Sequence, residues 1–414
     1  MIARIEDMEL KRIEQAVTGH RSDIIELSQS IGRNPELMFE EHESSRRVAE
    51  LLSSNGFEVE HPACGLDTAV IATYGTGSLV VGIVAEYDAL DGIGHGCGHN
   101  IIAASAVGAA LGLKGFVDEL DLTIKFLGTP AEEGGGGKVL MLREGAWDDC
   151  HLSMMIHGTF SPALGCQSMS STGRDLVTAR FTGRGAHAAY MPEAGRSAAS
   201  AVTLSQVAIG LMRQHLPKGS VVSPLITEAG IRTNIIPETA ELHVEVRSFD
   251  LDDRQSIMTT IENILTGCAQ ATETTVELTH PDIPYDPLKT DDRIGRIFDE
   301  TMEQDLGIEL IDLRAHPEKT PAASTDMGNV SRYLPSIHPV VALRDCSAVP
   351  HTAEFAAAAV SPAGDEAACN GALAMALTTA KVASDPGLRA ELIAEQKTRA
   401  PYSEAGALGT HSHS

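Results

Sequence analysis

Residues 85–100 read AEYDALDGIGHGCGHN and overlap the end of the run SLVVGIVAEY at 78–87. That run is nearly all apolar, which is typical of a strand buried on both faces at the centre of a sheet. The polar cluster after it would therefore lie at the carboxyl end of a central strand, where open α/β sheets place their ligand sites. The stretch predicts an α/β fold with a functional site at this edge.

The segments on either side of this stretch support the α/β interpretation. Apolar residues at helical spacing over 8–31 and 41–55 predict two amphipathic helices that open the chain. Further strands and helices are then expected to alternate. The expected strands are 68–74, 122–128 and 152–158, and the expected helices are 100–113 and 137–146.

From about residue 171 the pattern changes to that of a small α+β unit. Its expected elements are strand 175–183, helix 196–213, strand 241–249, helix 252–270 and strand 274–280. After a proline-rich stretch the α/β character returns, with helix 293–305, strand 337–344 and helix 362–384. The domains predicted are a discontinuous one over 1–170 and 284–400, an inserted one over 171–283, and a frayed tail over 401–414.

Length and composition limit the class of protein. A chain of 414 residues with 43% apolar content favours two domains with separate cores. The formal charge of −26 argues against nucleic acid and anionic membranes as partners and favours small molecules or proteins. The charged start lacks the apolar core of a signal peptide, no run is long enough to span a membrane, and seven scattered cysteines indicate no disulfide framework. These features predict a cytoplasmic protein.

Metal-binding residue types recur at three successive strand ends. The first end carries Cys97 and His99, the second carries Glu132 and Glu133 in GTPAEEGGGG at 128–137, and the third carries His157. Each alone is better explained as a buried thiol, a core histidine or a solvated acidic pair. Together, thiolate, imidazole and carboxylate are the ligands that zinc, manganese or cobalt prefer, so the set predicts a transition-metal site.

These motifs, with NPELMFEEHESS at 34–45 and HTAEF at 351–355, resemble the amidohydrolase branch of the glutamate carboxypeptidase and aminoacylase metallopeptidase family. The resemblance covers essentially the whole chain and is strongest to its aminobenzoyl-glutamate hydrolase and dipeptidase-like members. It implies a mixed-sheet, zinc-peptidase-like catalytic domain with an inserted α+β lid or dimerisation domain. It also implies a homodimer formed through the lid.

The resemblance implies two divalent metal ions, zinc, manganese or cobalt, and a role for each motif residue. The implied metal ligands are Cys97, His99, Glu133, His157 and His351. Glu132 is the implied general base. Glu86 and Asp88 are the implied outer carboxylates that orient the ligating imidazoles.

Substrate contacts are also implied by the resemblance. His187 would help to bind the scissile carbonyl, while Asn234 and Arg247 would bind the substrate's carboxylate. Ser324 and Asp326 occupy the place of a substrate loop. Without the resemblance, these residues are explained as well by a loop histidine, a turn residue, a strand ion pair and a polar turn.

The predicted reaction is hydrolysis of the amide bond of an N-acyl or aminoacyl amino acid with a free carboxylate. One departure from the wider family is its early His-x-Asp pair, where this chain reads Val84, Ala85 and Glu86, and another is Asp91 in place of proline. Two rival hypotheses remain. One is a metal-free hydrolase using Cys97 with His99, and the other is a catalytically silent binding protein that has kept the fold.

Overall fold

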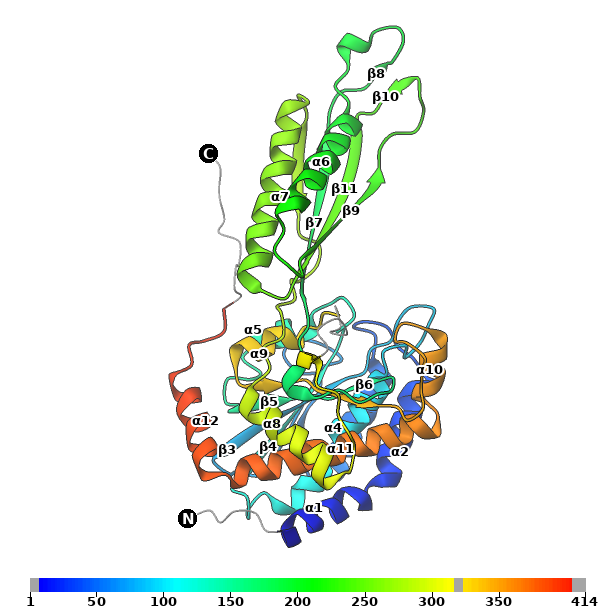
Figure 1. Ribbon diagram of the computed structural model, residues 1–414. Coiled ribbons are helices and arrows are strands. Elements are labelled where there is room, and N and C mark those ends of the chain that lie inside the picture. Colours follow the sequence, from blue (N-terminus) through cyan, green and yellow to red (C-terminus); the bar gives the residue numbers. More distant parts are fainter. Residues whose placement is uncertain (1–6, 316–322, 404–414) are drawn as a thin grey trace. The chain divides into compact units, whose positions relative to one another are not determined.

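A computed structural model describes residues 7–315 and 323–403 (Figure 1). The chain forms two compact units. One contains the described residues up to Ser170 and most of those after Leu288, and the other is built mainly from Ser171–Leu288. The predicted tail lies, from residue 404 onward, outside the described residues. No helix in the described ranges is long and apolar enough to cross a membrane.

The first unit is organised around a six-stranded mixed sheet with the strand order β1-β2-β4-β3-β5-β13. Strands β3, β4, β5 and β13 run parallel to one another. At one side of the sheet, β2 is antiparallel to β4, and β1 is antiparallel to β2. The strand bounds are β1 Glu58–Glu60, β2 Val70–Tyr74, β3 Leu79–Glu86, β4 Leu122–Thr129, β5 Leu152–Met154 and β13 Ser336–Ile337. The predicted mixed α/β sheet is therefore confirmed.

Helix α4 (His99–Leu113) is the central helix of this unit, and all of its residues are buried. It packs against α1 (Asp7–Gly19), α2 (Arg21–Arg33) and α11 (Pro362–Ser384). A Cβ at Gly108 would come within 2.5 Å of the Ile24 side chain, so glycine permits this close packing. A helix that is apolar on every side is expected where it is covered by other helices.

The single helix predicted over 8–31 is wrong, because the structure breaks it at His20 into α1 and α2. Gly19, a poor helix former, lies at the break, and the N–H of His20 turns back to the carbonyl of Val17. The chain therefore opens with three helices, the third being α3 (His42–Ser54).

The other elements of this unit are short. The predicted strands 152–158 and 337–344 are each divided in two, because β6 (His157–Thr159) and β14 (Val340–Ala342) form a separate parallel pair. The predicted helix 293–305 is α-helical only over α8 (Asp292–Glu300) and continues as a π-helical turn. The remaining helices are α5 Gly137–Arg143, α9 Met327–Tyr333, α10 Ala353–Ala359 and α12 Pro386–Thr398.

The second unit contains a four-stranded antiparallel sheet with the order β12-β7-β11-β9. The core between the sheet and the helices α6 (Ala198–Met212) and α7 (Leu251–Ala271) is apolar. Burial alternates along β11, as expected for a sheet with one covered face. The strands are β7 Gly173–Thr182, β9 Val221–Glu228, β11 Thr239–Ser248 and β12 Thr275–Thr279, with a separate antiparallel pair of β8 (Ala186–His187) and β10 (Ile235–Ile236). Strand β9 was not predicted.

Candidate metal centre

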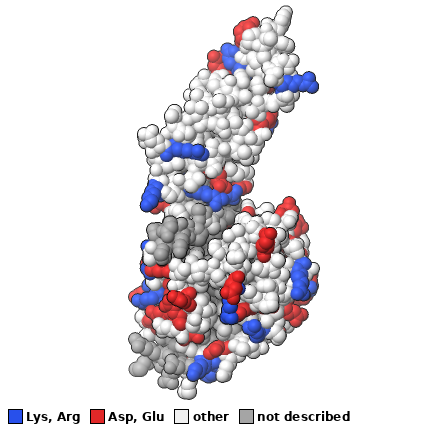
Figure 2. All heavy atoms as spheres, turned by 45° about the vertical axis from the view of Figure 1, so that its right-hand side comes forward, with Lys and Arg blue, Asp and Glu red and all other residues white. Residues whose placement is uncertain are grey.

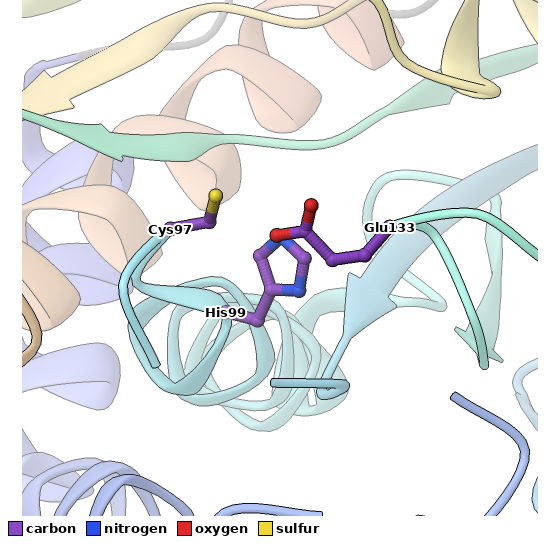
Figure 3. Close-up of side chains that lie close together, drawn as sticks. All are labelled: Cys97, His99 and Glu133. Atoms are coloured by element: carbon purple, nitrogen blue, oxygen red, sulfur yellow. The ribbon is translucent and has the colours of Figure 1, made fainter. Parts of the chain in front are cut away.

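Cys97, His99 and Glu133 bring their side chains together in the first unit (Figure 3). One ligand atom from each lies within 4.8 Å of the other two. Gly98, with φ +75°, makes the left-handed turn at the start of α4 that separates Cys97 from His99. Glu133 comes from the loop after β4, which is parallel to β3 with Glu86 opposite Thr129. The parallel register thus brings the first two predicted strand ends to one sheet edge.

Asp88 fixes the orientation of two members of this group. Its Oδ1 lies 2.9 Å from Nδ1 of His99, and its carbonyl oxygen lies 2.8 Å from the same nitrogen. Its Oδ2 accepts the backbone N–H of Glu133 at 2.9 Å. With Nδ1 engaged, the imidazole presents Nε2 to the other side chains, which is the arrangement that an outer carboxylate gives a ligating histidine.

Nε2 of His99 and two carboxylate oxygens near it are buried and lack a hydrogen-bond partner among the described residues. The two oxygens are Oε2 of Glu86 and Oε1 of Glu133. Nε2 lies 3.5 Å from Oε2 of Glu86 and 3.8 Å from Oε1 of Glu133. Buried polar atoms are almost always paired, so a group of acceptors without hydrogen-bond donors around one imidazole is an arrangement that suits a cation. Glu86, His99 and Glu132 form a second close group, which shares His99 with the first.

The pKa values in this cluster follow from burial and crowded negative charge. Burial, and then the Glu133 carboxylate, raise the pKa of the Cys97 thiol. Burial also raises the pKa of Glu132, and Glu86 and Glu133 add to the effect. Burial alone would lower the pKa of His99, but Asp88 and Glu86 raise it well above its usual value. A divalent cation would favour the thiolate, the carboxylates and a neutral imidazole, so the donor set fits a metal.

The other two predicted ligands lie nearby but outside these groups. The ring of His157 is 5.9 Å from that of His99 and perpendicular to it, and burial followed by the His99 charge lowers its pKa to about 4. His351 is exposed, has φ +68°, and donates its backbone N–H to the carbonyl of Gly96 at 2.9 Å. Within the described residues, neither imidazole belongs to a close ligand group.

Two buried residues beside the centre were not predicted from the sequence. The ammonium of Lys138 pairs with Glu86 and lies 2.7 Å from Oδ1 of Asp326. His338 is buried, its Nε2 has no hydrogen-bond partner in the described chain, and its ring lies 5.8 Å from that of His157. Lys138 follows four glycines and His338 precedes a proline, so nothing in their local sequence indicates this position.

Asp326 and Ser324, both predicted substrate contacts, occupy different surroundings. Asp326 is fully buried, and its two oxygens accept hydrogen bonds from the ammonium and the backbone N–H of Lys138. This geometry makes it a partner of Lys138 rather than an exposed group of a pocket. Ser324 is partly exposed and belongs, with its immediate neighbours, to the second compact unit.

The remaining predicted substrate residues lie in the second unit. His187 is exposed on β8, and its Nδ1 accepts the N–H groups of Ala189 and Tyr190. Asn234 is exposed, and its carbonyl accepts the N–H of Ala188. Arg247 lies on β11 and forms an ion pair of 2.7 Å with Glu245. The pairing of Arg247 is the strand ion pair that the sequence left open as an alternative.

Comparisons with known proteins agree with this architecture. Residues 171–271 match the family model described as "Peptidase dimerisation domain". The chain is 32% identical to the Xaa-Arg dipeptidase of Mus musculus, with 87% of this chain and 86% of that one covered. It is 33% identical to one of the subunits of the p-aminobenzoyl-glutamate hydrolase of Escherichia coli, over 64% of this chain and 59% of that one.

Solved structures show the same fold. A putative aminohydrolase from methicillin-resistant Staphylococcus aureus matches with a TM-score of 0.75 at 20% identity, covering 91% of this chain and 99% of that one. A Bacillus subtilis protein described as a dinuclear metal binding peptidase from the M20 family matches with a TM-score of 0.62 at 20% identity. In that comparison 86% of this chain and 98% of the other are covered.

Proposed function

Because the chain belongs to the M20 family of metal-dependent peptidases and amidohydrolases, we propose that it hydrolyses the amide bond of an N-acyl or aminoacyl amino acid with a free carboxylate. The observation that carries this proposal is the close group of buried Cys97 and His99 with half-buried Glu133, with Asp88 behind it and Glu132 beside it. Unpaired acceptors around one imidazole suit a cation, and the neighbouring carboxylate suits proton transfer.

The proposed cofactors are two divalent ions, zinc, manganese or cobalt. The proposed ligands are Cys97, His99, Glu133, His157 and His351, with Glu86 and Asp88 behind them. When bound, such ions polarise a carbonyl and lower the pKa of water toward neutrality. His157 and His351 are included because each contacts this site, His157 through its ring contact with His99 and His351 through its backbone hydrogen bond to Gly96.

Glu132 is the proposed general base and acid. It would take a proton from the attacking water and then deliver it to the nitrogen of the leaving amine. Without a metal, burial and the neighbouring carboxylates raise its pKa. Burial also raises the pKa of Cys97, whereas a nucleophilic cysteine needs a lowered pKa, so the Cys97–His99 hydrolase is the weaker hypothesis.

Substrate binding is proposed for residues of the second unit. His187 would contact the scissile carbonyl, and Asn234 with Arg247 would contact the carboxylate end. His187 and Asn234 are exposed beside each other at the β8–β10 strand pair, as such a role requires. Arg247 would have to exchange Glu245 for substrate, and Ser324 remains a proposed pocket residue. For Asp326 we propose an indirect role through Lys138.

We also propose that two copies of the chain associate through the second unit. Leu204, Val207 and Leu211 are 40%, 55% and 70% exposed and recur on one face of α6. Val221 and Leu225 are 50% and 62% exposed on β9, which contacts α6 and is the edge strand of its four-stranded sheet. An apolar stripe beside an edge strand suits a symmetric contact with a second copy. The face in Figure 2 also has few charged side chains over the middle of this unit.

The substrate class follows from the relatives in combination with the site. One relative is described as an Xaa-Arg dipeptidase and another as part of a p-aminobenzoyl-glutamate hydrolase. Both names fit an amide whose leaving amine belongs to an amino acid with a free carboxylate. A cytoplasmic location is proposed as well, since all seven cysteines are free thiols and five of them are buried.

The test is metal content by mass spectrometry on untreated protein, combined with hydrolysis of Xaa-Arg dipeptides, aminobenzoyl-glutamate and N-acyl amino acids before and after chelation. We expect close to two metals per chain and cleavage that chelation abolishes and metal restores. Cleavage that survives chelation but not thiol alkylation would favour the cysteine hydrolase. Neither metal nor cleavage after reconstitution would favour the silent binding protein.

A further inference from the structure

The segment NPELMFEEHESS at 34–45 contains two glutamates with different partners. Glu36 accepts hydrogen bonds from the backbone N–H groups of Glu43 and Ser44 and from the Ser44 hydroxyl, and so caps the start of α3. Glu41 occupies the N-cap position of that helix but makes no capping hydrogen bond with its side chain. The capping is done by Glu36, so the carboxylate of Glu41 serves another purpose.

Glu41 is directed at the loop that carries Glu132 and Glu133. Its Oε1 accepts the backbone N–H of Ala131 at 2.8 Å, and its Oε2 accepts the Thr68 hydroxyl at 2.8 Å. The side chain is fully buried. A buried carboxylate is costly unless both oxygens are hydrogen-bonded, and here each oxygen has one donor.

Ala131 is held in a conformation that alanine rarely adopts. Its φ is +57°, in the left-handed region, which is unfavourable for a residue with a Cβ and persists only when its surroundings enforce it. Its carbonyl accepts the N–H groups of Gly135 and Gly136, both at 2.9 Å. Glu41 on one side and these two amides on the other therefore fix both ends of the Ala131 residue.

The residues on either side of Glu132 both donate their backbone N–H groups to buried carboxylates. The N–H of Ala131 binds Glu41, and the N–H of Glu133 binds Asp88 at 2.9 Å. The reversal of the chain at Ala131 determines the direction in which Glu132 and Glu133 leave the loop. We propose that Glu41 is a positioning residue that holds this turn and thereby sets the orientation of Glu132 and Glu133.

The role of Glu41 in turnover rests on the proposed amide hydrolysis, whereas its effect on the loop that carries Glu132 and Glu133 does not. Phe39 supports the same loop, since a Cβ at Gly135 would lie 2.4 Å from its ring. The segment 34–45 thus acts on the loop through a carboxylate at Glu41 and packing at Phe39. Glu36, five residues before Glu41, provides a matched control because its carboxylate, among the described residues, hydrogen-bonds only to Glu43 and Ser44 at the start of α3.

The experiment compares Glu41→Ala, Glu41→Gln and Glu36→Ala at saturating metal. Glutamine keeps an oxygen for the N–H of Ala131, and the Thr68 hydroxyl accepts from its amide. We expect kcat to fall at least tenfold in Glu41→Ala with KM within about threefold of wild type, and Glu41→Gln to return kcat to within about threefold. Glu36→Ala should lower the melting temperature and leave kcat within about threefold.

A second measurement does not depend on activity. Hydrogen exchange of the peptide covering 130–136, followed by mass spectrometry in chelated protein, should be faster in Glu41→Ala and unchanged in Glu36→Ala. If Glu41→Ala fails to fold, the same hydrogen exchange is measured in Thr68→Val, which removes one of the two hydrogen bonds of Glu41. A modest increase in the exchange rate is expected.

An inactive wild type would defeat the proposed function, and the exchange measurement would still test whether Glu41 holds the loop. Equal kcat losses in Glu41→Ala and Glu36→Ala, or unchanged exchange in Glu41→Ala, would overturn the proposal.

Discussion

The two units each place some side chains in unusual surroundings, but the kind of side chain differs between them. The first buries ionisable side chains such as Glu86, His99 and Lys138, some with atoms that lack a hydrogen-bond partner in the described chain. The second exposes apolar side chains such as Val207 and Leu211. Buried polar groups and exposed apolar patches are the two departures that most often indicate function. The buried ionisable group in the first unit suits a bound cation, and the exposed apolar side chains of the second suit a contact with another protein surface.

The largest expected effect is at Glu132. Glu132→Gln removes the proposed proton carrier without changing the side-chain shape, so kcat should fall by a factor of about 100 to 10,000. Metal content should stay at the wild-type level. Steady-state kinetics and mass spectrometry on the same preparation measure both quantities.

Glu133→Gln is the matched control in the adjacent position, and it should lose metal together with activity. The division of roles between the two glutamates would be wrong if Glu132→Gln lost metal, or if it retained more than about a tenth of the wild-type kcat.

The second unit should respond to charge on its apolar stripe. Val207→Glu with Leu211→Glu places two carboxylates where the proposed contact buries two aliphatic side chains, which disfavours association through desolvation and like-charge repulsion. Sedimentation should show a dimer for wild type and a monomer for the double variant. Thr260→Glu, at an exposed position on α7, should remain dimeric. A wild type that sediments as a monomer at micromolar concentration would refute the interface.

The sequence predicted much of the fold around the candidate site, but it missed some local features. The apolar run at 78–87 was sufficient for a central strand, and the parallel register of β3 and β4 explains why two distant motifs meet. The break at His20 was missed because the apolar periodicity continues through it, while Gly19 and the turn to Val17 decide the local structure. Periodicity reports which face is buried and not where a helix is interrupted.

Candidate site residues could be predicted where they belong to a sequence motif. They could not be predicted where only tertiary packing brings them to the site. Cys97, His99 and Glu133 stand in recognisable motifs. Lys138 and His338 gain their place from tertiary packing, which puts Lys138 between Glu86 and Asp326, far apart in sequence. The apolar stripe on α6 was hidden for a related reason, since a mostly apolar helix does not show which of its faces is left uncovered.

A smaller effect is expected for the outer carboxylate of the first unit. Asp88→Asn keeps an oxygen for Nδ1 of His99 but loses the charge and puts an amide donor near the N–H of Glu133. Loss of such an outer partner typically weakens metal affinity about 10- to 100-fold. Titration of chelated protein with cobalt, followed by absorption spectroscopy, measures the dissociation constant. Asp91→Asn, in the same loop and exposed, should bind as wild type does.

The smallest effect concerns pH and sharpens the contrast between the units. Burial raises the pKa of Glu41 from 4.5 to about 6, so the folded protein holds more protons than the unfolded chain between these values. The contribution of Glu41 to the free energy of unfolding therefore falls as pH rises through this window, by about 2 kcal/mol in all. Glu41→Gln removes this dependence, so its stability relative to wild type should rise by about that amount between pH 4.5 and pH 7.

Glu245 in the second unit should show the opposite sign. Burial alone would raise its pKa, but hydrogen bonds and charge from Arg247 and Arg174 lower it. The stabilisation it gives is present above its unfolded pKa and is lost as pH falls through the lower folded value. Relative to wild type, Glu245→Gln should therefore be least stable at neutral pH and approach wild type in acid. Thermal denaturation of both variants from pH 4 to pH 7 measures the two slopes, and slopes of the same sign would show that the two units do not differ in how they hold their carboxylates.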